Sequence, residues 1–212
     1  MRRLTSAGVD HAPPEGNGLN DDPGRWLQRS SMYVVDHNER HVQKAYESEV
    51  DAAILELEDA VAPRMKVAAR EAAVEILSTP PPKPTYVRVN PFGTGLTLAD
   101  VEAVAGLPID AIRIAKTESR EDAHTIGRIL DELGSAAAVQ VLLESATGVE
   151  AIDGIVRAHP RIVGVSIGEQ DLRADLGAAE GGLLYARSRV IFAARAASLV
   201  PPWQSVWVDL KD

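Results

Sequence analysis

The chain has 212 residues, 45% of them hydrophobic, so it can bury one large core, and it has no cysteine, which excludes disulfides, zinc–thiolate sites and thiol nucleophiles. A formal net charge of −9 argues against nucleic acid or an anionic membrane as the main partner. No stretch approaches the roughly 18 apolar residues of a membrane span, and no apolar signal-peptide segment follows the N-terminal arginines, so we expect a cytoplasmic protein.

Residues 1–28 are rich in Gly, Pro, Asn and Asp without an apolar period, which predicts a flexible N-terminal extension. From there on, residues 29–212 are predicted to form one domain of alternating strands and helices. The expected strands cover residues 31–35, 50–59, 85–91, 110–116, 139–145, 162–168 and 205–210. The expected helices cover residues 36–48, 66–77, 98–107, 119–134, 148–160 and 185–200, with a polar linker before the last one.

This alternation predicts an α/β fold with a parallel sheet, either a doubly wound sheet or a barrel. Polar side chains at the carboxyl ends of several strands favour a barrel, because a barrel brings all these ends to one mouth. They are Glu56, Glu58, Arg88, Asn90, Lys116 and Glu144. Seven strands are recognised, so we expect a TIM (β/α)8-type barrel that lacks its eighth strand.

Two stretches place an acidic residue just after an apolar strand, VQVLLESATGVEA (139–151) and VGVSIGEQDLRADLG (163–177). In a parallel sheet, Glu144 and Asp171 would then share one rim, and two carboxylates there suit Mg²⁺, which leaves its other positions to water and substrate. The two carboxylates could equally cap the helices that follow them. The residues alone leave both interpretations open.

Seven motifs in order resemble the citrate lyase β-subunit-like (CitE-like) branch of the HpcH/HpaI aldolase family. They are RSSMYVVDHNERHVQKA, AAILELEDAVAPRMKVAAR, YVRVNP, IRIAKTES, VLLESATGVEAI, GEQDLRADLG and LLYARSRVIFAARAA. The resemblance implies a TIM barrel, Mg²⁺ (or Mn²⁺) as cofactor, and a carbon–carbon lyase that acts on 3-hydroxyacyl-CoA thioesters such as malyl-, citramalyl- or citryl-CoA. It also implies a small 2-oxo or 2-hydroxy acid and an acyl-CoA as ligands, and a homo-oligomer, either a trimer or a hexamer.

Position by position, the resemblance makes Glu144 and Asp171 the metal ligands. It makes Arg88 the arginine that binds the substrate carboxylate, a role that suits the planar guanidinium, although an arginine at a strand end can also be only a salt-bridge partner.

The resemblance places Arg29 and Lys66 near the coenzyme A entrance, where plain solvated surface is the alternative. Glu58 and Asp59 match an acidic pair that orders metal-bound water and the arginine, with an internal salt-bridge network as the alternative. Lys116 matches a lysine of the fourth strand, which we expect to be structural.

Three features depart from the family pattern: Val35 and Asp36 replace its Pro-Gly or Pro-Ala, Gln170 replaces an acidic residue, and the chain as given lacks the C-terminal lid that supplies a catalytic aspartate. The alternatives to a lyase are therefore a catalytically weakened ligand-binding or accessory subunit with the same site, or a malyl-CoA-type thioesterase.

Overall fold

The computed structural model describes residues 23–35, 38–203 and 205, and its centre is a six-stranded, all-parallel sheet in the order β1-β2-β3-β4-β5-β6. The strands are β1 (Ser31–Val34), β2 (Ala52–Glu56), β3 (Thr85–Val89), β4 (Ala111–Ile114), β5 (Ala138–Leu143) and β6 (Ile162–Ile167). Eight α-helices connect or follow them: α1 (Glu39–Glu47), α2 (Lys66–Leu77), α3 (Thr97–Val104), α4 (Arg120–Glu132), α5 (Ala146–Glu150), α6 (Ile152–Ile155), α7 (Glu169–Leu176) and α8 (Leu184–Ala196). Three short 3-10 helices complete the described part: η1 (Pro23–Trp26), η2 (Pro63–Met65) and η3 (Glu180–Leu183).

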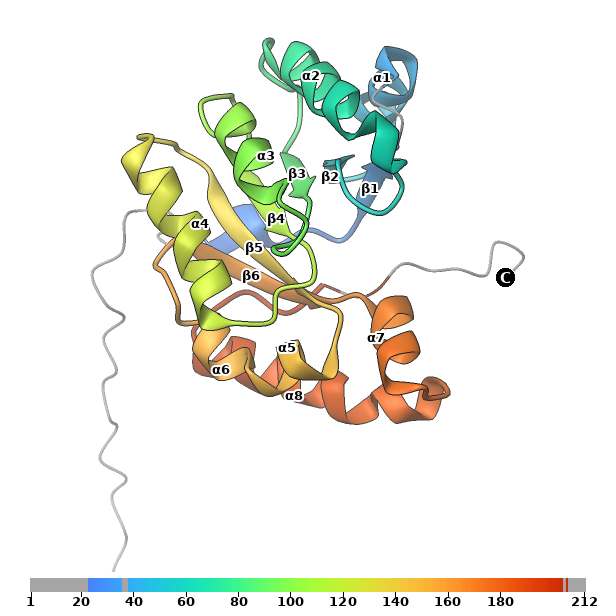
Figure 1. Ribbon diagram of the computed structural model, residues 1–212, viewed down its shortest axis with the longest axis vertical. Helices are drawn as coiled ribbons and strands as arrows, with labels where there is room; N and C mark the ends of the chain where they lie inside the picture. The colour runs from blue at the N-terminus through green and yellow to red at the C-terminus, as the bar shows by residue number, and fades with distance from the viewer. Residues whose placement is uncertain (1–22, 36–37, 204, 206–212) are drawn as a thin grey trace, which may run out of the picture.

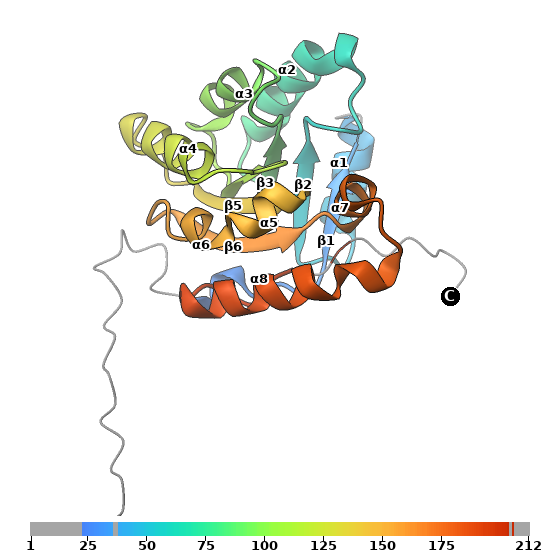
Figure 2. The same cartoon turned by 60° about the horizontal axis from the view of Figure 1, so that its bottom comes forward.

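The sheet curves and carries its helices on the outer side, as in a TIM-type (β/α) barrel (Figures 1 and 2). The strand order, with each strand beside its sequence neighbour, confirms the predicted fold class. A parallel bridge between Ser166 and Trp203 begins a further pairing beside β6. The expected strand 205–210 lies outside the described residues except for Ser205. No helix in the described part of the chain is long and apolar enough to cross a membrane.

Alternation along the strands separates two apolar layers. Leu55, Val87, Ile112 and Val141 belong to the large core between sheet and helices. A smaller inner cluster fills the other side of the sheet with Trp26, Ala52, Ile54, Tyr86, Ala111, Ala138, Val163 and Val200. Because all six strands run in one direction, the polar residues that follow them gather at one end of the barrel.

Part of the predicted N-terminal extension is well packed. Trp26, at the end of η1, is 1% exposed and belongs to the inner cluster. Arg25 donates a hydrogen bond to Asp110, which precedes β4. Arg25 and Trp26 of the extension therefore contact the barrel, whereas residues 1–22 lie outside the described part.

The prediction of a polar linker before the last helix is wrong in one respect, because this segment contains helix α7. Glu169 and Asp171 lie in its first turn, where negative charge is favourable, and Gly177 ends it in the left-handed conformation with φ of 58°. These are helix start and stop signals, although the apolar period between them is weak. The predicted helix 148–160 is also divided, into α5 and α6.

We expect the contribution of His159 to the stability of the fold to fall as pH drops below about 6.5, the ordinary pKa of histidine. Burial lowers the pKa of His159, although Asp131 opposes the shift, while His124 and Arg161 reinforce it. The unfolded chain then binds the proton more readily than the folded one, so protonation favours unfolding. Thermal unfolding of the parent chain and of His159→Gln at pH 7.5 and 5.5 measures the effect, because the parent should lose stability relative to the variant as the pH falls, and groups common to both chains cancel. An equal pH dependence in that variant would assign it to other groups.

Candidate metal and carboxylate site

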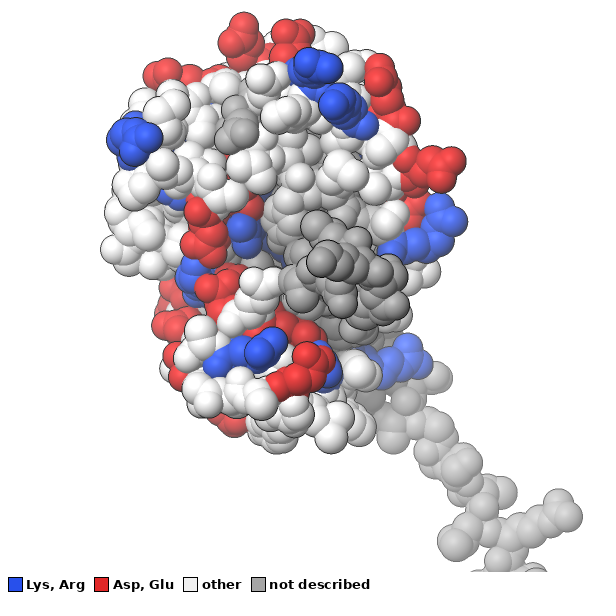
Figure 3. Space-filling view, turned by 90° about the vertical axis from the view of Figure 1, so that its right-hand side faces the viewer, with Lys and Arg blue, Asp and Glu red and all other residues white. Residues whose placement is uncertain are grey.

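The predicted site residues converge where the strands end, with two exceptions described below. Glu144 follows β5, Lys116 follows β4, Arg88 lies near the end of β3, and Glu58 and Asp59 follow β2. Asp171 reaches the same place from α7 instead of from a strand end, which corrects the prediction of two strand-end carboxylates. Figure 3 faces the side where β6 leads into α7 and shows acidic and basic side chains next to one another on it.

Glu144 is a buried carboxylate directly after the end of β5. It is 4% exposed, and its carboxylate accepts a hydrogen bond of 2.8 Å from the backbone N–H of Lys116. Burial raises the pKa of Glu144 to about 7. A Cβ atom at Gly168 would lie 2.4 Å from Oε1 of Glu144, so glycine is needed for the close approach of β6 and α7 to this carboxylate.

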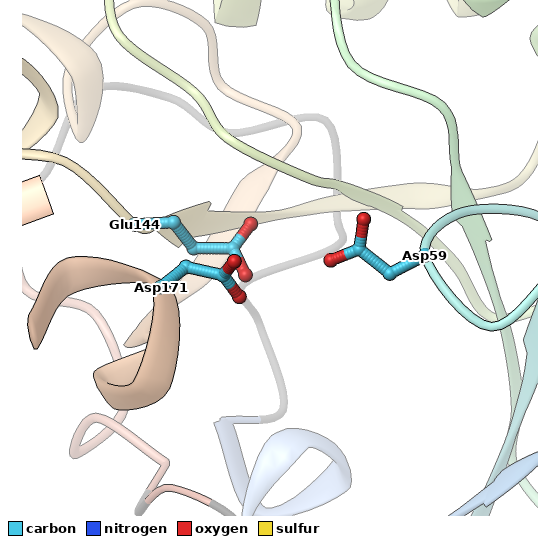
Figure 4. A group of neighbouring side chains, drawn as sticks. All are labelled: Asp59, Glu144 and Asp171. Atoms are coloured by element: carbon cyan, nitrogen blue, oxygen red, sulfur yellow. The ribbon is translucent and has the colours of Figure 1, made fainter. Parts of the chain in front are cut away.

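Three carboxylates form a cluster at this end of the sheet. Asp59, Glu144 and Asp171 each offer an oxygen, and these oxygens lie within 4.8 Å of one another. Glu144 and Asp171 lie side by side, and Asp59 faces them from the loop after β2 (Figure 4). Oxygens around one Mg²⁺ at about 2.1 Å are at most about 4.2 Å apart, so a set within 4.8 Å of one another can hold one ion directly, with small side-chain movements, or through water. The donor set of hard oxygens fits Mg²⁺ or Mn²⁺.

The alternative that these acids are helix caps fails for Glu144. Ser145 is the N-cap of α5 and accepts a hydrogen bond from the backbone N–H of Gly148. The N-cap of α7 is Gly168, with no side-chain cap bond, and Asp171 lies inside the first turn. Asp171 therefore keeps a favourable interaction with the helix dipole, but its carboxylate faces Glu144.

Lys116 organises the acidic loop after β2. Its Nζ atom lies 2.6 Å from Glu58 and 2.9 Å from Asp59, and although burial works against the charge, these two hydrogen bonds raise the pKa of Lys116. Its backbone is left-handed with φ of 47°, and its N–H donates a hydrogen bond to Glu144. Lys116 therefore has the structural role that was predicted for it, and it also lies within the cluster of carboxylates.

Arg88 is held from one side by carboxylates. Its Nε and one Nη lie 2.6 and 2.5 Å from Glu56, the same Nη lies 3.3 Å from Glu58, and its guanidinium stacks 4.7 Å from the ring centre of Tyr33. Glu56 is 1% exposed. The guanidinium is therefore fixed in one orientation, and Arg88 is a salt-bridge partner in this structure. Its binding of a substrate carboxylate stays a prediction.

Lys66 and Arg29 lie apart from this cluster. The Nζ atom of Lys66 donates hydrogen bonds to the backbone oxygens of Leu57 and Glu58, at 2.8 and 2.7 Å. Lys66 therefore stabilises the backbone of the loop after β2. Arg29 precedes β1, at the opposite end of the parallel sheet, and pairs with Asp51 at 2.7 Å. The geometry gives no support to Arg29 at a ligand entrance on the carboxyl side.

The buried charged residues that were not among the predicted site residues include Glu56, Arg113 and Asp100. Arg113 is the register partner of Arg88 on β4, is 5% exposed, and donates a 2.6 Å hydrogen bond to Ser166. Asp100 of α3 is 0% exposed and binds Arg70 and Asn90. The alternation of Arg113 with Ile112 and Ile114 was a usable signal, whereas nothing local distinguishes Asp100 from a surface acid.

Sequence comparison decides the relationship. The profile described as HpcH/HpaI aldolase/citrate lyase matches residues 29–212. The chain belongs to this family. The resemblance of the seven motifs to this family is therefore confirmed. The relatives described below confirm the assignment to the CitE-like branch.

Two curated family members illustrate the range of activities. The citrate lyase subunit beta of Haemophilus influenzae is 33% identical over 82% of this chain and 64% of its own length. A (3S)-malyl-CoA thioesterase of Cereibacter sphaeroides is 35% identical over 70% of this chain and 51% of its own length. The chain thus spans about half to two thirds of these relatives.

Solved structures of the family share the fold. A citrate lyase beta subunit from M. tuberculosis, complexed with oxaloacetate and magnesium, is 29% identical with a TM-score of 0.74, covering 92% of this chain and 83% of that one. A CitE complex from the same organism contains magnesium, acetoacetate and coenzyme A; it is 28% identical with a TM-score of 0.74, covering 89% of this chain and 69% of that one.

Proposed function

We propose that this chain forms the metal- and carboxylate-binding barrel of an Mg²⁺-dependent carbon–carbon lyase that acts on 3-hydroxyacyl-CoA thioesters such as malyl-, citramalyl- or citryl-CoA. The observation that carries the proposal is the convergence of Asp59, Glu144 and Asp171 at the strand ends. The names of the relatives, which include magnesium, oxaloacetate and coenzyme A complexes, support the same chemistry.

In this proposal Glu144 and Asp171 hold the ion, and Asp59 orders the water around it. Bound Mg²⁺ would supply Lewis-acid stabilisation of the charge that develops on the substrate oxygens. Arg88 binds the carboxylate of the small acid, and Glu56 keeps its guanidinium in the plane that two parallel hydrogen bonds need. Glu58 and Lys116 fix the loop that carries Asp59.

Arg88→Lys tests the carboxylate clamp. Lysine keeps the charge but loses the planar fork, so the affinity for oxaloacetate or pyruvate in the presence of Mg²⁺ should fall by about tenfold or more, which corresponds to one charged hydrogen bond. Calorimetric titration measures this, with Arg64→Lys, an exposed residue of η2, as the matched control. Equal affinity in Arg88→Lys would remove the clamp from the proposal.

A thioesterase is the second candidate, because the relative from C. sphaeroides carries that activity in its name. The two reactions differ in products. Cleavage of malyl-CoA gives glyoxylate and acetyl-CoA without consuming water, whereas hydrolysis gives malate and the free thiol of coenzyme A. A thiol reagent detects the second product cleanly since the chain itself has no cysteine, and a carbonyl reagent detects the first.

A further inference from the structure

Asp171 differs from Glu144 in how the chain holds it. Glu144 directly follows β5, and its carboxylate accepts a hydrogen bond from the backbone N–H of Lys116. Asp171 instead projects from the first turn of α7, beside Glu144 (Figure 4). The position of the Asp171 carboxylate therefore depends on where α7 lies and on how this helix is rotated about its own axis.

Packing and capping hold α7 only weakly. Leu172 is the one buried residue among the eight of this helix, all of which the structure describes. The N-cap residue, Gly168, makes no side-chain hydrogen bond to the first turn. Because most of the stability of a short helix comes from packing of an apolar face, a helix with one buried side chain needs other contacts to fix it.

Two polar contacts fix α7 to neighbouring helices on different sides. Asp175 accepts a 2.7 Å hydrogen bond from the backbone N–H of Ala146, the first residue of α5. Glu169 pairs with Arg187 of α8, whose Nε and one Nη lie 2.7 and 2.6 Å from the two carboxylate oxygens. At 100° per residue, Glu169 and Asp175 point in directions about 120° apart. Together they set the rotation of α7 and hence the direction of Asp171.

The pair between Arg187 and Glu169 has the geometry of a rigid contact. Its two parallel hydrogen bonds combine charge with a fixed orientation of both side chains. The side chains of Arg187 and Glu169 are 36% and 18% exposed, so the pair is partly withdrawn from water. Arg187 also donates a 2.9 Å hydrogen bond to Glu180 of η3, in the segment between α7 and α8. The guanidinium thus connects the start of α7 to α8 and to η3.

Mg²⁺ is sensitive to such a contact because it requires nearly ideal octahedral geometry at about 2.0–2.1 Å. Contacts that orient the ligands of a metal commonly change its affinity by about 10- to 100-fold. We propose that Arg187 is a positioning residue of the metal site, which holds Asp171 in place through Glu169 and α7. Neither Arg187 nor Glu169 belongs to the three-carboxylate cluster. The inference rests on the proposed function, in which Asp171 holds the ion.

Two substitutions of opposite charge test the proposal. Arg187→Gln and Glu169→Gln should each weaken Mg²⁺ binding by about tenfold or more, measured by calorimetric titration of the full chain. Loss of the positive charge of Arg187 would by itself favour a bound cation, whereas loss of the negative charge of Glu169 would disfavour it. A displaced Asp171 is therefore required to weaken binding in both variants.

Two further variants separate geometry from charge. Glu169→Gln combined with Arg187→Gln should bind Mg²⁺ about as weakly as either single variant, because all three chains lack the same contact. Arg187→Lys keeps the charge but cannot form the bidentate pair, so its affinity should lie between those of the parent and of Arg187→Gln.

Arg189→Gln is the matched control. Arg189 lies two residues further along α8 and pairs with Asp153 at 2.6 Å, and its side chain is 25% exposed. This pair joins α8 to α6, which carries none of the three carboxylates of the cluster. Its loss should leave the affinity for Mg²⁺ unchanged. Circular dichroism without metal selects a titration temperature at which every variant is folded.

Several outcomes overturn the proposal. Tighter or equal Mg²⁺ binding in Arg187→Gln, beside weaker binding in Glu169→Gln, assigns the effect to charge. An equal loss in Arg189→Gln assigns it to general loosening of α8. Losses that multiply in the double variant mean that the two residues act independently. A parent chain that binds no Mg²⁺ removes the proposed function as well, whereas a parent that binds the ion and variants that bind it equally well remove this inference alone.

Discussion

Replacing Glu144 by Gln is expected to lower the affinity of the chain for Mg²⁺ by at least about a hundredfold, the upper end of what loss of an outer-shell partner costs a metal site. The substitution removes a charged oxygen from the three-carboxylate cluster. Asp171→Asn should act in the same direction. Calorimetric titration with Mg²⁺, and with Mn²⁺ as a second probe, measures the loss.

Loss of affinity can be separated from loss of structure. Gln has the volume of Glu and can still accept the hydrogen bond from the backbone N–H of Lys116. Since burial disfavours the ionised form of Glu144, a neutral amide should leave the fold at least as stable in the absence of metal. The thermal unfolding midpoint of Glu144→Gln without metal should therefore stay at or above that of the parent chain.

Glu150→Gln is the matched control, because Glu150 is an exposed acid on the helix that follows Glu144. It should leave the metal affinity unchanged. Unchanged affinity in Glu144→Gln and Asp171→Asn as well would show that the ion, if bound, uses other oxygens.

Much of the site could be predicted because it depends on strand direction and alternation. Glu58, Arg88, Lys116 and Glu144 lie at or just after the ends of parallel strands, so their convergence follows from the order of elements alone. The position of Arg29 was open to the same reasoning. It precedes a strand, so it must lie at the opposite end of the sheet.

The parts that could not be predicted depend on contacts between distant segments. Asp171 was expected at the rim beside Glu144, but as a strand-end residue, and helix α7 was missed. This helix is stabilised by its C-cap Gly177 and by Glu169 pairing with Arg187, not by an apolar stripe. Trp26 looked like part of a tail because its packing partners lie on several strands of the inner cluster.

The largest effect on stability is expected at Asp100, an acid that sequence reasoning gave no role. Its carboxylate accepts hydrogen bonds from Nε of Arg70 at 2.7 Å, and from the backbone and side-chain nitrogens of Asn90 at 3.0 and 2.6 Å. It therefore joins α2 and α3 to the end of β3, two residues beyond Arg88. Removing it leaves a buried guanidinium and a buried amide without their acceptor.

Asp100→Ala should lower the free energy of unfolding by about 3–5 kcal/mol, the usual cost of breaking a buried pair by removing one partner. For a chain of this size, each kcal/mol shifts the unfolding midpoint by about 2–4 °C, so a decrease on the order of 10 °C is expected. Urea unfolding followed by circular dichroism measures the free energy directly.

Asp153→Ala provides the contrast, because Asp153 pairs with Arg189 at a comparable 2.6 Å but its side chain is 57% exposed. An exposed pair contributes at most about 1 kcal/mol, so the two alanine variants should differ by several-fold despite similar ion-pair distances. Asp100→Asn, which keeps the shape and one acceptor oxygen, should fall between them. Equal losses at Asp100 and Asp153 would mean that burial of this network adds nothing to its effect.

If Asp100→Ala also weakens oxaloacetate binding while remaining folded at the measuring temperature, the connection through Asn90 contributes to the position of Arg88 as well as to stability.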